Sequence, residues 1–346
     1  MKQIGHFIDG ELVPGNSGRQ KDIYNPNTGD IQAQVNLATP EELDAAVASA
    51  AKAQVLWHNT NPQRRSRIMF AYKQLVESHI DELAALLSSE HGKVLADSRG
   101  DVIRGVDVIE FACGVPHAQK GEHTYGAGPE IDVYSMRKPL GVVAGITPFN
   151  FPAMIPMWMF GMAIATGNAC ILKPSEKDPS VPMRLAELFV QAGGPRGLLQ
   201  CINGDKEIVD AICDHPTIKA VSFVGSSDIA QYVYSRATSN GKRAQCMGGA
   251  KNHGIIMPDA NMDQAVKDIL GAAYGSAGER CMALPVVVPV GENTLTINVA
   301  NVNIVAGMLI QNSAGTTTYG TVKQVLSTTA FTCTIAIQIP AATALT

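Results

Sequence analysis

The stretch GVVAGITPFNFPAMIPMWMFGMAIATGNACILKP, residues 141–174, decides the fold class. It opens with a short apolar run, turns at PFNFP, continues through an apolar segment of helical length and ends in a second apolar run. Short apolar runs bounded by turn residues are typical of strands buried in a parallel sheet. The stretch therefore predicts a strand, a buried helix and a parallel second strand, the repeating unit of an α/β protein.

The absence of charge from Leu140 to Leu172 would also allow a membrane span. Three prolines and four glycines interrupt this segment, so we expect no span.

The N-terminus, MKQIGHFIDGE, lacks the apolar core of an export signal. The seven cysteines include no CxxC pair and no Cys/His spacing that suits zinc. We therefore expect a reducing compartment, the cytoplasm, and no bound metal.

The strand–helix pattern continues beyond residue 174. Apolar runs LLQCING and KAVSFVG alternate with helical segments that include VPMRLAELFVQAG, KEIVDAICDH and DIAQYVYSRAT. Nearer the N-terminus, Thr39-Pro40-Glu41-Glu42 predicts a capped helix start, and further helices are expected over 62–90 and 98–113. We predict an α/β fold built on a parallel sheet with helices on both faces.

The composition changes after Val290. Lys323 is the only charged residue between Asn293 and Thr346, and TLTINV and FTCTIAIQI alternate in polarity with period two. Residues 293–346 are therefore predicted to form a small β-rich module. The whole chain of 346 residues has a formal net charge of −4, which argues against a nucleic-acid surface.

Polar residues follow three of the predicted strands, at the sheet edge where α/β proteins bind ligands. Asn150 in PFNFP could donate its amide to a developing oxyanion, or it could cap the following helix. Lys173 and Glu176 could hold the ribose of a nucleotide, or they could lie in a solvated turn. Ser226 begins a helix where a pyrophosphate could bind, or it is an ordinary capping serine. No GxGxxG fingerprint is present.

The segment GSAGERC, residues 275–281, places a cysteine after small residues and beside Arg280. This setting favours a thiolate nucleophile. A buried structural cysteine is the alternative. No neighbouring histidine motif indicates a Cys–His protease pair.

PFNFP, KPSE, FVGSS and GERC, in this order, resemble the motifs of the aldehyde dehydrogenase superfamily. The resemblance is closest to its CoA-acylating methylmalonate-semialdehyde dehydrogenases, through GDVIRGVDVIEFACGVPH, PFNFPAMIPMWMF, MGGAKNH and GAAYGSAGERCMALPV. It covers residues 2–292. It implies a Rossmann-like NAD-binding domain over 1–246, with an oligomerisation arm at 121–140, and the start of a catalytic domain over 247–292. The β-rich tail, 293–346, looks unrelated to the family.

The resemblance implies oxidation of malonate or methylmalonate semialdehyde to acetyl-CoA or propionyl-CoA, with NAD as cofactor and coenzyme A as acyl acceptor. Cys281 would attack the aldehyde carbon, and Asn150 would hold the oxyanion together with the backbone N–H of Cys281. Arg104 and Arg280 would hold the substrate carboxylate, which a guanidinium fork suits. The residues implied to surround NAD are Thr147, Phe149, Lys173, Glu176, Lys177 and Ser226.

The chain departs from the wider family at two points. Cys246 occupies the position of a glutamate that activates water in hydrolytic members. We therefore expect transfer to CoA, with hydrolysis as the alternative and Cys246 as a passive neighbour rather than a second nucleophile. The family's later Glu-x-Phe-Gly-Pro motif is not found after Val290. We accordingly expect a truncated catalytic domain with weak or absent turnover.

Three further expectations follow from these departures. One alternative function is an inactive NAD-binding remnant or scaffold. Another is a structural or attachment protein that acts through the β-rich tail. Members of the family form homo-oligomers, but the strand that partners the arm is not found here.

Overall fold

The computed structural model describes residues 1–290, 294–297, 309–311, 318–327 and 330–335. These residues divide into two compact units. Unit 1 comprises Met1–Ala250 and Ser276–Cys281, and unit 2 comprises Lys251–Gly275 and the described residues from Met282 onward. The domain boundaries expected after residues 246 and 292 stay predictions.

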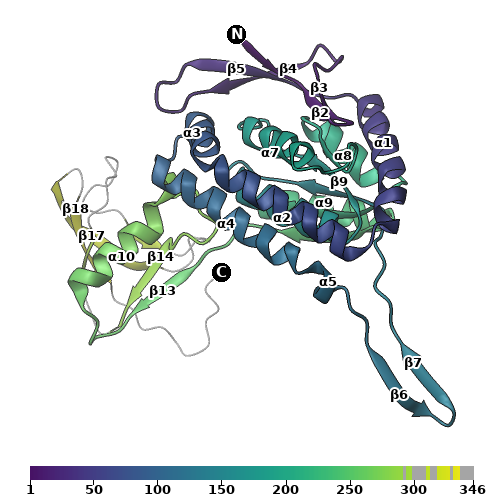
Figure 1. Cartoon of the computed structure of the whole chain (residues 1–346). Coiled ribbons are helices and arrows are strands. Elements are labelled where there is room, and N and C mark those ends of the chain that lie inside the picture. The colour runs from purple at the N-terminus through teal and green to yellow at the C-terminus, as the bar shows by residue number, and fades with distance from the viewer. Residues whose placement is uncertain (291–293, 298–308, 312–317, 328–329, 336–346) are drawn as a thin grey trace. The chain divides into compact units, whose positions relative to one another are not determined.

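A seven-stranded sheet forms the centre of unit 1 (Figure 1). Its strands, in spatial order, are β12 (Arg243–Met247), β11 (Ile218–Val224), β8 (Val142–Ile146), β9 (Ala169–Lys173), β10 (Leu199–Cys201), β2 (His6–Ile8) and β3 (Glu11–Val13). The strands from β12 to β10 pair in parallel, which confirms the predicted parallel α/β sheet. The N-terminal hairpin of β2 and β3 adds an antiparallel edge.

Helices pack around this sheet. They are α1 (Pro40–Asn59), α2 (Pro62–Ser78), α3 (Ile80–His91), α4 (Leu95–Cys113), α5 (Val115–Ala118), α6 (Met154–Ala165), α7 (Ser180–Gln191), α8 (Lys206–Asp214) and α9 (Ser227–Ser239). The predicted capping box of α1 is confirmed. The Thr39 hydroxyl accepts the N–H of Glu42 at 3.3 Å, and the Glu42 carboxylate accepts the N–H of Thr39 at 2.9 Å.

The helical region predicted over residues 62–90 is confirmed, but it consists of two helices separated by a break at His79. This residue has φ −111° and ψ 13°, outside the helical range. The His79 ring and the Ser78 hydroxyl both bond the carbonyl of Leu75, at 2.7 and 2.8 Å, which satisfies a carbonyl group in the last turn of α2. The following helix, α4, begins at Leu95 rather than at Ser98.

Two buried aromatic side chains tie α1 and α2 to the core. Trp57 donates its indole N–H to the carbonyl of Ile164 in α6 at 2.7 Å, and Tyr72 donates its hydroxyl to the carbonyl of Leu185 in α7 at 3.2 Å. Each ring thus buries apolar surface while its polar group stays paired. α6 is the predicted buried helix, and within the described residues no helix is both long and apolar enough to cross a membrane.

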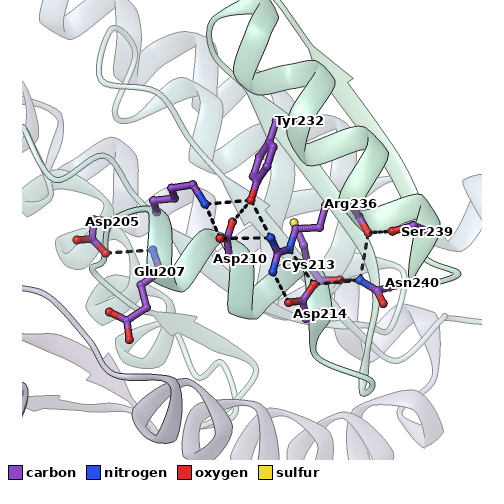
Figure 2. Close-up of polar contacts among 10 residues, drawn as sticks. Asp205, Glu207, Asp210, Cys213, Asp214, Tyr232, Arg236, Ser239 and Asn240 are labelled. Atoms are coloured by element: carbon purple, nitrogen blue, oxygen red, sulfur yellow. Dashed lines mark hydrogen bonds and ion pairs between the residues drawn. The ribbon is translucent and has the colours of Figure 1, made fainter.

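A polar network joins α8 to α9 (Figure 2). Arg236 on α9 donates to both carboxylate oxygens of Asp214 on α8, at 2.9 and 2.6 Å. Beside this pair, Tyr232 donates its hydroxyl to Asp210 at 2.7 Å. Bidentate arginine–carboxylate pairs fix orientation as well as distance. The network therefore holds α9 against α8.

Two smaller sheets complete unit 1. One pairs β1 (Lys2–Ile4), β5 (Ile31–Asn36) and β4 (Gln20–Tyr24) in that order. The other is an antiparallel hairpin of β6 (His123–Gly128) and β7 (Ile131–Tyr134), drawn apart from the helices in Figure 1. The residues of this hairpin are exposed apart from half-buried Gly128. Both strands lie within residues 121–140, where the resemblance implies an oligomerisation arm, and that role stays a prediction.

Unit 2 contains α10 (Met262–Tyr274) and a parallel pair of strands, β13 (His253–Ile256) and β14 (Val286–Pro289). An antiparallel sheet follows, in the order β15 (Thr294–Ile297), β18 (Ala330–Ile335), β17 (Thr318–Ser327) and β16 (Leu309–Gln311). These strands confirm the predicted β structure of the tail where it is described. The rest of the tail, as predicted over 293–346, lies outside the described residues.

Candidate active site

The PFNFP turn follows β8 at the carboxyl edge of the parallel sheet. Asn150 does not cap the next helix, because Ala153 is the N-cap residue of α6 and no side chain caps it. The alternative of a capping asparagine is therefore wrong. The Asn150 amide instead donates Nδ2–H to the carbonyl of Glu279 at 2.5 Å. This contact brings the amide to the segment that ends in Cys281.

The segment before Cys281 begins with a short 3-10 turn, η1 (Ser276–Gly278). Ser276 and Ala277 have φ values of 56° and 57°, in the left-handed region that non-glycine residues rarely adopt. Cys281 itself is exposed, so the alternative of a buried structural cysteine is wrong. An exposed sulfur on a turn is open to attack a small electrophile.

Asp97 on α4 holds this strained turn, although no sequence motif marks it. Its Oδ2 accepts the backbone N–H of Ser276 at 3.0 Å. Its Oδ1 accepts a guanidinium N–H of Arg280 at 2.8 Å. One carboxylate thus fixes the start of the turn and the residue next to Cys281.

The two arginines expected to hold a substrate carboxylate meet at one small cavity. Arg104 projects from α4 and Arg280 from the Cys281 segment, and both line a cavity of about 40 Å³. The cavity's other lining residues are Asp97, Gly100, Asp101, Phe151 and Ser276. Paired guanidinium groups at a small cavity suit a small carboxylate. The two arginines predicted from the sequence therefore line one cavity, where the Arg280 guanidinium is paired with Asp97.

Lys173 and Glu176 form a half-buried ion pair at the end of β9. Lys173 is 5% exposed and its ammonium lies 3.3 Å from Glu176 Oε2, so the solvated-turn alternative is wrong. Lys21 on β4 reaches the other carboxylate oxygen at 3.0 Å. Burial lowers the pKa of Lys173. Burial would raise the pKa of Glu176, but the Lys173 charge, a backbone hydrogen bond and Lys21 outweigh it and lower that pKa to about 2.

A larger cavity of about 750 Å³ lies beside this pair, and Phe149, Glu176 and Lys177 line it. The Lys177 ammonium sits 4.3 Å from the Phe149 ring centroid, and His91 stacks on the same ring at 6.2 Å. Burial, with the Lys93 charge, lowers the pKa of His91 to about 4. His91 also lines this cavity, yet no local sequence signal marked it.

Three residues expected near NAD, Thr147, Lys173 and Ser226, are not among those that line this cavity. Thr147 is buried, and its Oγ1 finds no hydrogen-bond partner among the described residues. Ser226 is exposed at the N-cap position of α9, but its side chain makes no capping hydrogen bond. Ser226 therefore holds the N-cap position considered for it, although its hydroxyl does not bond the first turn of α9.

Cys246 lies in β12, paired in register with Phe223 of β11. It is half-buried, and burial raises the pKa of its thiol. A thiol with a raised pKa is a weak nucleophile at neutral pH. In the part of the chain that the structure describes, no group of His, Cys, Asp and Glu side chains is arranged to hold a metal.

Comparison with known proteins identifies relatives of this chain. The aldehyde dehydrogenase family model matches residues 12–295. Malonate-semialdehyde dehydrogenase of Pseudomonas aeruginosa is 50% identical over 292 residues, which are 84% of this chain and 59% of that protein. The acylating mitochondrial methylmalonate-semialdehyde/malonate-semialdehyde dehydrogenase of Rattus norvegicus is 48% identical, over 83% of this chain and 54% of its own length.

A solved structure from Sinorhizobium meliloti 1021, described as a putative methylmalonate-semialdehyde dehydrogenase complexed with NAD, superposes with a TM-score of 0.83 at 62% identity. The match covers 84% of this chain and 60% of that one. The chain thus spans about three-fifths of the length of the relatives it matches. A family model that matches most of the chain, together with these relatives, shows that the chain belongs to the aldehyde dehydrogenase family.

Proposed function

We propose that this chain oxidises malonate or methylmalonate semialdehyde with NAD and passes the acyl group from Cys281 to coenzyme A. The cavity shared by Arg104 and Arg280 is the observation that supports this proposal best. It lies next to the segment that bears Cys281, so a substrate held there by its carboxylate would present its aldehyde near the sulfur. An uncharged aldehyde would gain nothing from the two guanidinium groups.

The residues at the larger cavity are suited to NAD. The Glu176 carboxylate can accept hydrogen bonds from ribose hydroxyls, and Lys177 supplies positive charge for the phosphates. Lys173 does not line the cavity but pairs with Glu176, which does. The unpaired Oγ1 of Thr147 is a further polar group that a ligand could satisfy. NAD, when bound, supplies the hydride acceptor for the oxidation.

The first chemical step belongs to Cys281. Its thiolate attacks the aldehyde carbon, and the carbonyl electron pair moves to oxygen as a thiohemiacetal oxyanion. The Asn150 amide and the backbone N–H of Cys281 are the proposed donors to that oxygen. Asn150 would exchange its present acceptor, the Glu279 carbonyl, for the oxyanion. Loss of hydride then leaves an acyl thioester on Cys281.

The second step releases the thioester. A hydrolytic route needs a general base to activate water, and the position used for one in hydrolytic relatives here holds Cys246. The CoA thiolate is a stronger nucleophile than water and needs no such base. Its attack on the thioester carbon expels the Cys281 thiolate and forms acyl-CoA. The carboxylate held by the arginines leaves as CO2, and the electron pair of the broken carbon–carbon bond takes up a proton from solvent at the α carbon.

The test uses the purified chain with NAD, coenzyme A and malonate semialdehyde, with formation of NADH and acetyl-CoA as readouts. The proposal expects both products at the weak turnover that a truncated catalytic domain implies, dependence on coenzyme A, and little reaction with propanal. Binding of NAD without any NADH would instead support the inactive NAD-binding scaffold. Absence of NAD binding would overturn both hypotheses.

A further inference from the structure

A fully buried ion pair lies beneath the PFNFP turn. Lys93, in the link between α3 and α4, places its ammonium 3.2 Å from Oδ2 of Asp101 on α4. Neither side chain is exposed to solvent. Burying two charges is costly even when they pair, and apolar residues often serve stability equally well. The pair therefore calls for an explanation beyond packing.

Both partners of this pair also bond the backbone of the turn. Lys93 Nζ donates to the carbonyl of Asn150 at 2.7 Å. Asp101 Oδ1 accepts the N–H of Met154, the first residue of α6, at 2.7 Å. The segment from Asn150 to Met154 is thus held at both ends by one ion pair.

Phe151, which lies between Asn150 and Met154, is held by the same pair. The Lys93 ammonium lies 4.3 Å from the ring centroid of Phe151, a cation–π contact in a buried setting. Phe151 is 3% exposed. The ammonium therefore has three partners: a carboxylate, a carbonyl and an aromatic ring. A neutral side chain of the same length could not satisfy them together.

The electrostatics of the pair agree with this geometry. Burial lowers the pKa of Lys93 and raises the pKa of Asp101 to about 6, while the opposite charge of each partner opposes these shifts. An ammonium beside a carboxylate is the form of the pair that fits the hydrogen bonds of both side chains. The hydrogen bonds to Asn150 and Met154 are then charge-assisted, which makes them shorter and stronger than neutral ones.

We propose that Lys93 and Asp101 are positioning residues for chemistry at Cys281, because they fix the backbone from which the Asn150 amide reaches the reacting oxygen. The inference rests on the proposed function, in which that amide stabilises an oxyanion. Donors to an oxyanion work only within a narrow range of positions, so a small shift of the Asn150 backbone weakens them. Asp101 also lines the Arg104–Arg280 cavity, so the test below uses an ester that carries no carboxylate.

The test compares two reactions of the Cys281 sulfur in the full chain. With p-nitrophenyl acetate, the thiolate attacks the ester carbon, an oxyanion forms, the carbon–oxygen bond breaks and p-nitrophenolate leaves; the thiol proton goes to solvent. With iodoacetamide, the same thiolate displaces iodide and no oxyanion forms. Only the first reaction needs the Asn150 amide. Cys281→Ala identifies the part of each signal that belongs to Cys281.

The variant of choice removes both charges together, as Lys93→Met with Asp101→Asn, so that no unpaired charge is left buried. The side-chain carbonyl of the new asparagine can still accept the N–H of Met154. The double variant therefore removes the bond to the Asn150 carbonyl while the start of α6 keeps its acceptor. Lys242→Met is the matched control. Lys242 is also buried and also donates to main-chain carbonyls, those of His215 and Ile218, away from PFNFP.

Removing an oxyanion donor slows acyl transfer by about 100-fold or more, and Asn150→Ala sets that scale here. We expect the Lys93/Asp101 double variant to slow acetylation of Cys281 by about tenfold, with alkylation changed by less than about twofold. Lys242→Met should change neither reaction. In the Asn150→Ala background the double variant should have no further effect, because the two act through one amide.

Unchanged acetylation, an equal loss in the Asn150→Ala background, or an equal loss in Lys242→Met would overturn the positioning role and leave the proposed function standing. Equal slowing of both reactions would also overturn it, since that result reports general damage to the fold. If the unaltered chain releases no p-nitrophenolate through Cys281, the proposed function fails, and the positioning role fails with it.

Discussion

Asp97 and Arg280 form an ion pair in which the same carboxylate also bonds the backbone of Ser276, so one side chain on α4 holds both ends of the turn before Cys281. Ser276 and Ala277 have left-handed backbone conformations that cost free energy and persist only where the surroundings impose them. Asp97 is the group that imposes them here.

Replacement of Asp97 by alanine should therefore destabilise unit 1. Loss of two hydrogen bonds, one of them to a charged group, is expected to lower the free energy of unfolding by about 1–3 kcal/mol. Urea denaturation measures this. Glu11→Ala is the control, because Glu11 makes a single surface pair with Arg196 and is 67% exposed. The control should lose less than about 0.5 kcal/mol. Equal losses in the two variants would count against the role given to Asp97.

Arg104→Met should impair use of a carboxylated substrate selectively. We expect KM for malonate semialdehyde to rise by about tenfold or more, because a charge-assisted bond to the carboxylate is removed. The rate with propanal should hardly change. Arg99→Met is the control: Arg99 is also on α4, pairs with Asp81, and does not line the Arg104–Arg280 cavity. A similar loss with both aldehydes would show that Arg104 acts on the fold rather than on the substrate carboxylate.

Much of this structure could be predicted from local sequence signals. The parallel strands could be recognised because each is a short apolar run that ends in proline or polar residues. The capping box at Thr39 is a pattern of four adjacent residues. Such signals lie within one turn or strand. The break at His79 could not be predicted, because neither proline nor glycine marks it. Bonds from the Ser78 and His79 side chains to the Leu75 carbonyl end the helix instead.

The residues that support the site could not be predicted in this way. Asp97 lies 179 residues from Ser276, and Lys93 lies 57 residues from Asn150. Each is an ordinary charged residue in its own segment, and only the tertiary fold supplies its partner. Cys281 and Asn150 could be proposed from the sequence because each lies in a short motif of adjacent residues. Asp97, Lys93 and Asp101 act at a distance along the chain, so no short motif marks them.

His91 should make the fold sensitive to mild acid. Burial lowers the pKa of His91 to about 4, whereas the ordinary value is 6.5. Protonation is therefore easier in the unfolded chain, so the contribution of His91 to stability is full above 6.5, falls between 6.5 and about 4, and is lost below that range. His91→Gln should flatten this part of the pH dependence in urea denaturation, while His58→Gln, at an exposed position on α1, should leave it unchanged. An identical pH dependence for His91→Gln and the unaltered chain would contradict the assignment.

Cys246→Glu should redirect the Cys281 thioester from coenzyme A to water. Cys246 is half-buried in β12, and its thiol has a raised pKa, so it cannot serve as a base at neutral pH. A glutamate in the same setting would have its pKa raised by burial toward neutrality, the range in which a general base works best. We expect release of free acid without coenzyme A to rise by about tenfold or more, within the usual contribution of a general base. Cys246→Gln adds the same bulk without a base and should leave the dependence on coenzyme A intact. An equal rise in hydrolysis in Cys246→Glu and Cys246→Gln would mean that either substitution simply lets water reach the thioester. That result would contradict the explanation that acyl transfer to coenzyme A follows from the missing carboxylate.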